Sequence, residues 1–392
     1  MRKTYFAGTH RTRHPADTWQ AIKPLLGDYG ITRVADVTGL DTIGIPVTMA
    51  MRPLARTLSV AQGKGVTLDA ARVSGAMEAI EAWHGEHAVP AAAVLQAPAC
   101  GLILPYRVTD LDQHPGSLLT DRSVLDWIPA RSALDGTPAL VPSACVQLGR
   151  ETRTDWRMHL PSSSTNGLAS GNTRAEAVTH ALYELIERDV VSDLADRSGT
   201  RSAGRIDPAS VTEPYCRQLL DLLDAARAWV ELWHLPNRYG VPVMACYLWR
   251  EDQPVTLVSG TGAHLAPAVA LSRAITEAAQ SRLAQITGSR EDIPAAVHRA
   301  GRTHRGPTTP DRAGEPWDQA VCEYSPAAPE QDHEEAQHLA GLVAAVAQAE
   351  PMLVELTWGP YTRSEFAVVK VVAPGLRYSS RHTVPRPQEA AA

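Results

Sequence analysis

The sequence has few of the features that mark several common protein classes. Phenylalanine occurs only twice, which fits a GC-rich coding bias rather than a function, and the five cysteines stand far apart, with no pair in C-x-x-C spacing. This distribution argues against a zinc or thiol redox motif, and an odd number of cysteines favours a reducing compartment. No apolar run reaches the roughly 18 residues that a membrane-spanning helix needs. The first residues also lack the apolar core of a signal peptide. We therefore expect a cytoplasmic protein.

Charge and length narrow the class further. The net charge of −6 gives no nucleic-acid footprint, so no nucleic-acid or membrane partner is expected. A chain of 392 residues, 44% of them hydrophobic, can bury a large core divided into two or three subdomains. We expect one domain with subdomains at about 1–90, 91–210 and 211–380, and a flexible tail over 381–392.

The stretch from 164 to 191 predicts a helix with two unlike faces. At 3.6 residues per turn, Glu176, His180, Glu184 and Glu187 fall within roughly 80° of one another, while the rest of the circumference is apolar. Like charges this close repel one another. Two interpretations are open: water screens an exposed acidic face, or a cation lies in front of it.

Two further stretches resemble the first and suggest an internal repeat. In residues 63–87 and 260–283 a glycine-rich segment again leads into an alanine-rich helix. Superposed, the three stretches align the pairs Glu78/Glu81, Glu184/Glu187 and Glu277/Gln280, and they align Ala71, Ala177 and Ala270. A single acidic helix can be explained as a solvent-exposed surface. Three related acidic helices indicate instead the walls of a single polar site.

The order of the expected elements predicts the fold class. Alternating segments over 31–53 predict two strands joined by GLDTIG, and strands follow at 57–65, 139–149, 230–235, 241–250, 255–264, 352–358 and 366–376. Helices are expected near 15–29, 214–229, 266–286 and 333–350. This order indicates an α+β fold with largely antiparallel sheets and helices on their outer faces. The polar stretch 289–332 is expected to be a mobile loop, either an ordinary surface loop or a lid.

Basic residues near the start leave two interpretations open. Arg11, Arg13 and His14 are expected to form a solvated tail unless they bind phosphate. The Gly63–Lys64–Gly65 turn does not have P-loop spacing, yet it can offer N–H groups and an ammonium group to phosphate.

The glutamates of the three helices suit a hard cation. Mg²⁺ prefers carboxylate oxygens and keeps waters for a phosphate partner. Lys64, Arg188, Arg282 and Gln280 would then face the phosphates of a nucleotide. A glycosidase with two carboxylates is the rival interpretation, but it explains neither the repetition nor the arginines.

These motifs resemble the YcaO family. The matching segments are SGAMEAIEA, NGLASGNTRAEAVTHALYELIERD and LSRAITEAAQSRL, and the resemblance covers most of the chain. It implies a YcaO-like fold and an ATP- and Mg²⁺-dependent enzyme that activates backbone amides of a precursor peptide. In the family a nucleophile adds to the carbonyl and ATP phosphorylates the oxyanion, so that phosphate leaves. The product is an azoline, a macroamidine or, with sulfide, a thioamide.

The resemblance also implies roles for individual residues. The magnesium ligands would be Glu78, Glu81, Glu176, Glu184 and Glu187. The nucleotide contacts would be Ser74, Asn172 and Arg188, with Arg11 and Thr18 added by a looser alignment of the N-terminus. Catalysis would depend on Glu184, Glu187 and Arg188, and His180 is either a general base or a structural histidine.

Two departures from the family pattern bear on partners. Ala82 replaces the usual arginine of the first motif, and the tail has only Pro385 and Pro387 in place of a Pro-x-Pro-x-Pro end. No leader-peptide-binding segment is visible, so a standalone member is expected, as a homodimer. The segment 31–46 is similar both to TfuA-partnered thioamide formers and to standalone cyclodehydratases. A nucleotide-binding partner without catalysis and a structural scaffold are the competing classes.

Overall fold

Two compact units make up the chain. The computed structural model describes residues 1–87, 95–113, 116–149, 160–196, 204–250, 257–291, 314–324, 328–357 and 365–378. Unit 1 comprises residues 81–199 and 331–392 together with Met1, and unit 2 comprises residues 2–80 and 200–330. The division falls inside one helix, α2 (Leu68–His87). The subdomain limits expected near residues 90 and 210 stay a prediction.

Unit 2 contains a four-stranded sheet and a three-stranded sheet. The first has the order β10 (Gly204–Ile206), β11 (Ala228–His234), β12 (Val243–Arg250) and β13 (Val258–Ala263). The second has the order β3 (Arg33–Asp36), β4 (Val47–Met51) and β5 (Val60–Lys64). Every strand pair in both sheets is antiparallel, as the sequence predicted.

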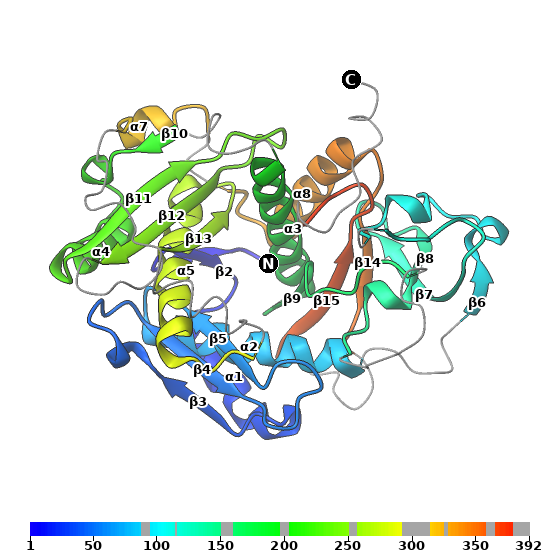
Figure 1. The fold of residues 1–392 in the computed structure, drawn as a ribbon, viewed down its shortest axis with the longest axis horizontal. Helices are drawn as coiled ribbons and strands as arrows, with labels where there is room; N and C mark the ends of the chain where they lie inside the picture. The colour runs from blue at the N-terminus through cyan, green and yellow to red at the C-terminus, as the bar shows by residue number, and fades with distance from the viewer. Residues whose placement is uncertain are drawn as a thin grey trace. The chain divides into compact units, whose positions relative to one another are not determined.

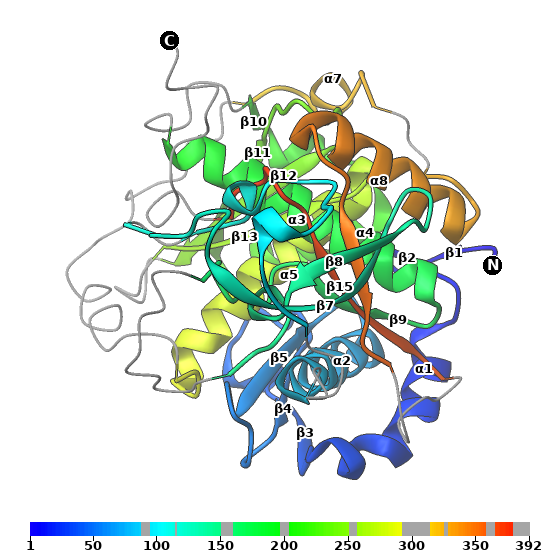
Figure 2. The same cartoon turned by 90° about the vertical axis from the view of Figure 1, so that its right-hand side faces the viewer.

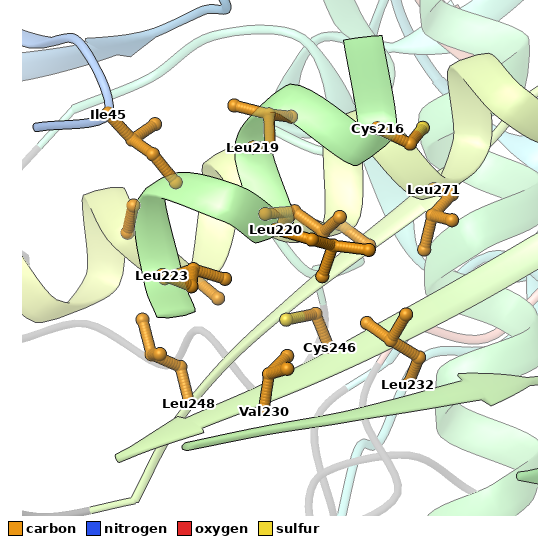
Figure 3. Packing of buried hydrophobic residues seen from close by; sticks show 14 of the residues in the cluster. Ile45, Cys216, Leu219, Leu220, Leu223, Val230, Leu232, Cys246, Leu248 and Leu271 are labelled. Carbon is orange, nitrogen blue, oxygen red and sulfur yellow. The ribbon is translucent and has the colours of Figure 1, made fainter. Parts of the chain in front are cut away.

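Helices α4 (Pro214–Ala225) and α5 (Pro267–Thr287) pack on the four-stranded sheet (Figure 1). Leu219, Leu220 and Leu223 of α4 meet Leu232 and Cys246 in a buried cluster, which Figure 3 shows from close by. Their spacing follows the 3.6-residue period of an amphipathic helix. Unit 2 also holds α1 (Pro15–Ile22) and α7 (Trp317–Ala320), with 3₁₀ turns at Lys23–Tyr29, Thr38–Leu40 and Pro208–Ser210.

The solvated N-terminal tail expected around Arg11 is wrong. β1 (Thr4–Phe6) and β2 (Thr9–Arg11) form an antiparallel hairpin in which Arg11 lies opposite Thr4. The His14 ring nitrogen then accepts a hydrogen bond from the N–H of Ala16 and caps α1. Short polar strands of this kind lack alternating apolar residues, so the sequence pattern did not predict them.

Unit 1 is built on a six-stranded sheet. Its order is β6 (Leu95–Pro98), β7 (Val124–Ser132), β14 (Met352–Glu355), β15 (Ala367–Val372) and β9 (Leu168–Gly171), and β8 (Pro138–Pro142) also pairs with β7. Helix α3 (Arg174–Asp196) packs on β9 and β15, and α8 (Asp332–Ala347) packs on α3 (Figures 1 and 2). Short 3₁₀ turns lie at Ala99–Gly101, Val108–Asp110 and Ser143–Cys145.

The first two residues of the expected Gly63–Lys64–Gly65 turn belong to a strand, and so does the glycine-containing segment before α3. Gly63 and Lys64 end β5, and Leu168–Gly171 form β9. Glycine weakens most strands because it has no side chain to pack, but here it lets the strand approach a helix backbone closely. The expected loop over 289–332 lies largely outside the described residues, and its described part includes α7, whose Trp317 is buried.

Candidate active site

The three aligned stretches are strand–helix pairs with the same contact. In each pair a strand glycine lies against the helix alanine that the repeat aligns: Gly63 at Ala71, Gly171 at Ala177 and Gly262 at Ala270. A Cβ atom on any of these glycines would come under 3.0 Å from helix backbone atoms. The three alanines are fully buried. The small residues of the repeat therefore bring each acidic helix close to its strand.

Helix α3 carries the central carboxylates of unit 1. Glu176 and Glu187 are buried, whereas His180, Glu184 and Arg188 are half-buried. The interpretation of this stripe as a fully exposed acidic face, screened by water, is therefore wrong. Glu184 Oε2 accepts the N–H of Gly167 at 3.0 Å.

Burial raises the pKa of Glu184, and the nearby Arg188 guanidinium and the Gly167 N–H partly oppose that rise. Removing a carboxylate from water disfavours its ionised form, and an added cation would reverse this effect. The chemistry of Glu184 thus fits a position in front of a metal ion.

Glu176 already has partners at the start of α3. Its Oε1 accepts the Asn172 side-chain amide at 3.0 Å and the Asn172 N–H at 3.4 Å, while Thr173 Oγ1 accepts the Glu176 N–H at 3.0 Å. This reciprocal arrangement is a variant of the capping box, which satisfies donors at a helix start. Glu176 and Asn172 therefore have a structural task beside any role toward metal or nucleotide.

On helix α2, Glu78 is exposed and Glu81 is half-buried one turn later. Ser170 Oγ of β9 donates to Glu81 Oε1 at 2.5 Å. Ser74, one turn before Glu78, is half-buried. Ser170 was missed in the sequence because its partner is distant, although it lies within the segment LASG that precedes α3.

In unit 2 the expected phosphate contacts have protein partners. Lys64 Nζ pairs with Glu277 at 2.6 Å, and Gln280 Nε2 donates to the Gln62 carbonyl at 3.0 Å. Arg282 is 1% exposed and contacts Asp41 through Nε at 2.6 Å and a terminal nitrogen at 3.3 Å. This two-point pair gives Arg282 a structural role, so its nucleotide role stays a prediction.

The N-terminal candidates differ in exposure. Arg11 is half-buried at the end of β2, and Thr18 is buried at 5% exposure on α1. The hairpin could not be predicted from the spacing or the charge of this segment. The assignment of Arg11 and Thr18 to the nucleotide rests on the family alignment alone.

Within the described ranges, no three His, Cys, Asp or Glu side chains are grouped closely enough to form a metal site by themselves. Mg²⁺ usually takes one or two protein carboxylates and completes its octahedron with waters and phosphate oxygens. Carboxylates that are not grouped with one another therefore suit a metal that arrives with a nucleotide.

Comparison with known proteins decides the family. The family model described as YcaO cyclodehydratase, ATP- and Mg²⁺-binding, matches residues 62–377. The chain belongs to the YcaO family. It is accordingly an ATP-dependent enzyme of the cyclodehydratase class, and its cofactors are ATP and Mg²⁺.

Two relatives of this YcaO protein are named as uncharacterised proteins. A Mycobacterium tuberculosis protein is 41% identical over 303 residues, which are 76% of this chain and 67% of the relative. A Rhizobium leguminosarum bv. trifolii protein named for its position in the tfuA 3′ region is 37% identical over 298 residues, covering 72% of this chain and 69% of the relative.

Solved structures share the fold. The YcaO structure from Methanopyrus kandleri bound with AMPPCP and Mg²⁺ matches with a TM-score of 0.72 and 23% identity, over 99% of both chains. A heterocyclase in complex with substrate and cofactor matches with a TM-score of 0.76 and 20% identity, over 96% of this chain. The chain spans 54% of that heterocyclase's length. These likenesses confirm the expected mixed helix and antiparallel-sheet fold.

Among the described residues no helix is long and apolar enough to cross a membrane.

Proposed function

We propose that this YcaO enzyme activates a backbone amide carbonyl of a ribosomally synthesised peptide and thereby catalyses cyclodehydration. A nucleophile of the peptide adds to the carbonyl carbon and gives up its proton. The carbonyl oxygen takes the γ-phosphoryl group of ATP and ADP departs. The oxygen then leaves as phosphate while the amide nitrogen loses its proton and forms a C=N double bond to the former carbonyl carbon. The product is an azoline or a macroamidine, and the peptide loses one water.

Glu184 of α3 carries this proposal: it is half-buried, it accepts the Gly167 N–H and it lies within the matched family range. We assign Mg²⁺ to Glu78, Glu81, Glu176, Glu184 and Glu187, and the nucleotide to Ser74, Asn172 and Arg188 with Arg11, Thr18, Lys64, Gln280 and Arg282. Bound Mg²⁺ would offset phosphate charge. His180, which lies one turn from both Glu176 and Glu184, is the candidate general base.

Thioamide formation is the second candidate, and the Rhizobium relative favours it. That protein is named for the tfuA region, which suggests a TfuA-like partner for this chain as well. The amide would be activated in the same way, but external sulfide would replace the internal nucleophile. A homodimer and a cytoplasmic location complete the proposal, and the five free cysteines support the latter.

Intact-mass spectrometry tests both candidates. The pure protein is incubated with ATP, Mg²⁺ and the precursor peptide encoded nearest to it, and then with sulfide and a TfuA-like partner added. Loss of one water in the first mixture supports cyclodehydration, and exchange of oxygen for sulfur in the second supports thioamide formation.

The matched variants are Glu184→Gln and Glu334→Gln, the latter on the exposed face of α8. We expect Glu184→Gln to lower turnover at least ~100-fold, in line with the loss of a preorganised electrostatic group, and Glu334→Gln to leave it unchanged. An active Glu184→Gln enzyme, or an unmodified peptide in both mixtures, would contradict the proposal.

A further inference from the structure

Lys370 is a buried cation of unit 1 to which the proposed chemistry gives no role. It lies on β15 opposite Leu168 of β9 and is 3% exposed. Its Nζ donates to the carbonyl oxygens of Ser164 at 2.6 Å and Asn166 at 2.8 Å. Burying an ammonium group costs several kcal/mol before its partners compensate, and an apolar side chain of similar volume often serves packing as well or better. The charge of Lys370 therefore calls for an explanation beyond packing.

The carbonyls that Lys370 binds belong to the turn that contacts Glu184. Gly167 ends this turn at φ +76°, a conformation that favours glycine. Its carbonyl accepts the Val371 N–H at 2.8 Å, and its own N–H donates to Glu184 Oε2 at 3.0 Å. Two successive residues of β15 thus hold the turn, and the turn presents one N–H to the Glu184 carboxylate.

Space around the turn is restricted. A Cβ atom on Gly167 would come under 3.0 Å from the Val371 carbonyl oxygen. The backbone of the turn therefore packs directly against β15. Loss of the Lys370 hydrogen bonds would displace the Gly167 N–H.

We infer that Lys370 is a positioning residue: it fixes the Ser164–Gly167 turn so that the Gly167 N–H holds the Glu184 carboxylate in the orientation that takes the cation. The inference rests on the proposed function, because that proposal assigns Glu184 to Mg²⁺. Hydrogen bonds behind a metal ligand typically contribute 10- to 100-fold to metal affinity. Lys370 supports Glu184 indirectly: it binds the carbonyls of Ser164 and Asn166, and the same turn presents the Gly167 N–H to Glu184.

The test compares Lys370→Met, Lys370→Gln and Lys370→Arg with the wild type. Calorimetry measures how binding of a non-hydrolysable ATP analogue depends on Mg²⁺ concentration. We expect Lys370→Met to raise the Mg²⁺ requirement about 10- to 100-fold. Lys370→Arg, which keeps the charge and several donors, should restore most of the affinity, and Lys370→Gln should fall between them. If Lys370→Met fails to fold, Lys370→Gln decides.

Arg52→Met is the matched control. Arg52 is also a buried cation, 4% exposed, whose Nε donates to a backbone carbonyl, that of Tyr29, at 3.2 Å. This variant should lower thermal stability and leave the Mg²⁺ requirement unchanged. A Lys370→Met or Lys370→Gln protein that behaves like Arg52→Met has lost only a structural contact, and the positioning role is then wrong.

A second readout does not depend on magnesium. Hydrogen exchange of the peptide covering residues 164–171 should be faster in Lys370→Met than in the wild type, and unchanged exchange overturns the inference. If the wild type shows no Mg²⁺-dependent nucleotide binding, the proposed function fails, and the exchange measurement still decides whether Lys370 holds the turn. In the Glu184→Gln background, Lys370→Gln should add no further loss of Mg²⁺ affinity, whereas additive losses contradict coupling through Glu184.

Discussion

Burial disfavours the ionised form of Asp112, a half-buried residue of unit 1. The pKa of its carboxyl group is raised from 3.8 to about 6 by burial, although the Ser162 hydroxyl and the Arg377 guanidinium oppose the rise. Between pH 4 and 6 the folded protein therefore binds more protons at this site than the unfolded chain. Stability from this group is present at pH 4 and is lost as the pH rises through 6.

Asp112→Asn should remove this loss. At pH 4 the variant and the wild type should have similar free energies of unfolding, because the native Asp112 is protonated there. At pH 7 the variant should be more stable by about 1–3 kcal/mol, since each unit of pKa shift corresponds to about 1.4 kcal/mol. Urea denaturation at both pH values measures the difference. A stability difference that does not change with pH would show that Asp112 is ionised without cost in the fold.

The distant partners of the site residues could not be predicted from the sequence. The stripe of Glu176, Glu184 and Glu187 could be predicted because it follows one helical period. Ser170 beside Glu81, Lys370 behind the Gly167 turn and Asp41 beside Arg282 could not, because each partner is distant in the sequence. No local pattern specifies which distant donor a carboxylate will meet.

At the scale of elements, the strand–helix pairs explain why glycines precede the acidic helices. The sequence indicated a repeat through three aligned alanines, and the structure shows each alanine against a strand glycine. Most of the longer strands and the amphipathic helices were predicted because alternation and helical periods are local, but β7, the longest described strand, was not. β9 and the β1–β2 hairpin were missed, because glycine and short polar stretches are typical of turns.

Gly260→Ala tests this close approach. A Cβ atom at Gly260 of β13 would come under 3.0 Å from the Ala278 nitrogen and the Ala274 carbonyl of α5, both backbone atoms with little room to move. We expect a loss of about 1–3 kcal/mol in the free energy of unfolding, as for an overpacked core.

Gly204→Ala is the control in the same sheet, because a Cβ at Gly204 of β10 meets nothing within 4 Å. It should change stability by no more than about 0.5–1 kcal/mol, the range for an unstrained glycine-to-alanine change. Equal effects of the two substitutions in urea denaturation would mean that α5 and β13 separate easily.

At the scale of the whole molecule, each unit is assembled from separate stretches of chain. In unit 1, β14 and β15 come from the last third of the sequence, yet they lie in the sheet between β7 and β9. The sequence predicted these strands but not their neighbours, because strand order depends on pairing across more than 150 residues, as between Val369 and Ala169. The central Glu184 helix packs on this sheet, so its support also comes from the C-terminal stretch.

A chain ending at residue 330 should therefore lose the fold of unit 1. It lacks α8, β14 and β15, which leaves β7 and β9 without the strands between them and uncovers the apolar face of α3. We expect no cooperative thermal transition for unit 1 in circular dichroism, together with aggregation through the unpaired strands. A chain ending at residue 378 keeps every described element and should melt within a few degrees of the full chain, so a normal melting curve for the shorter chain would show that β9 and α3 fold without their C-terminal partners.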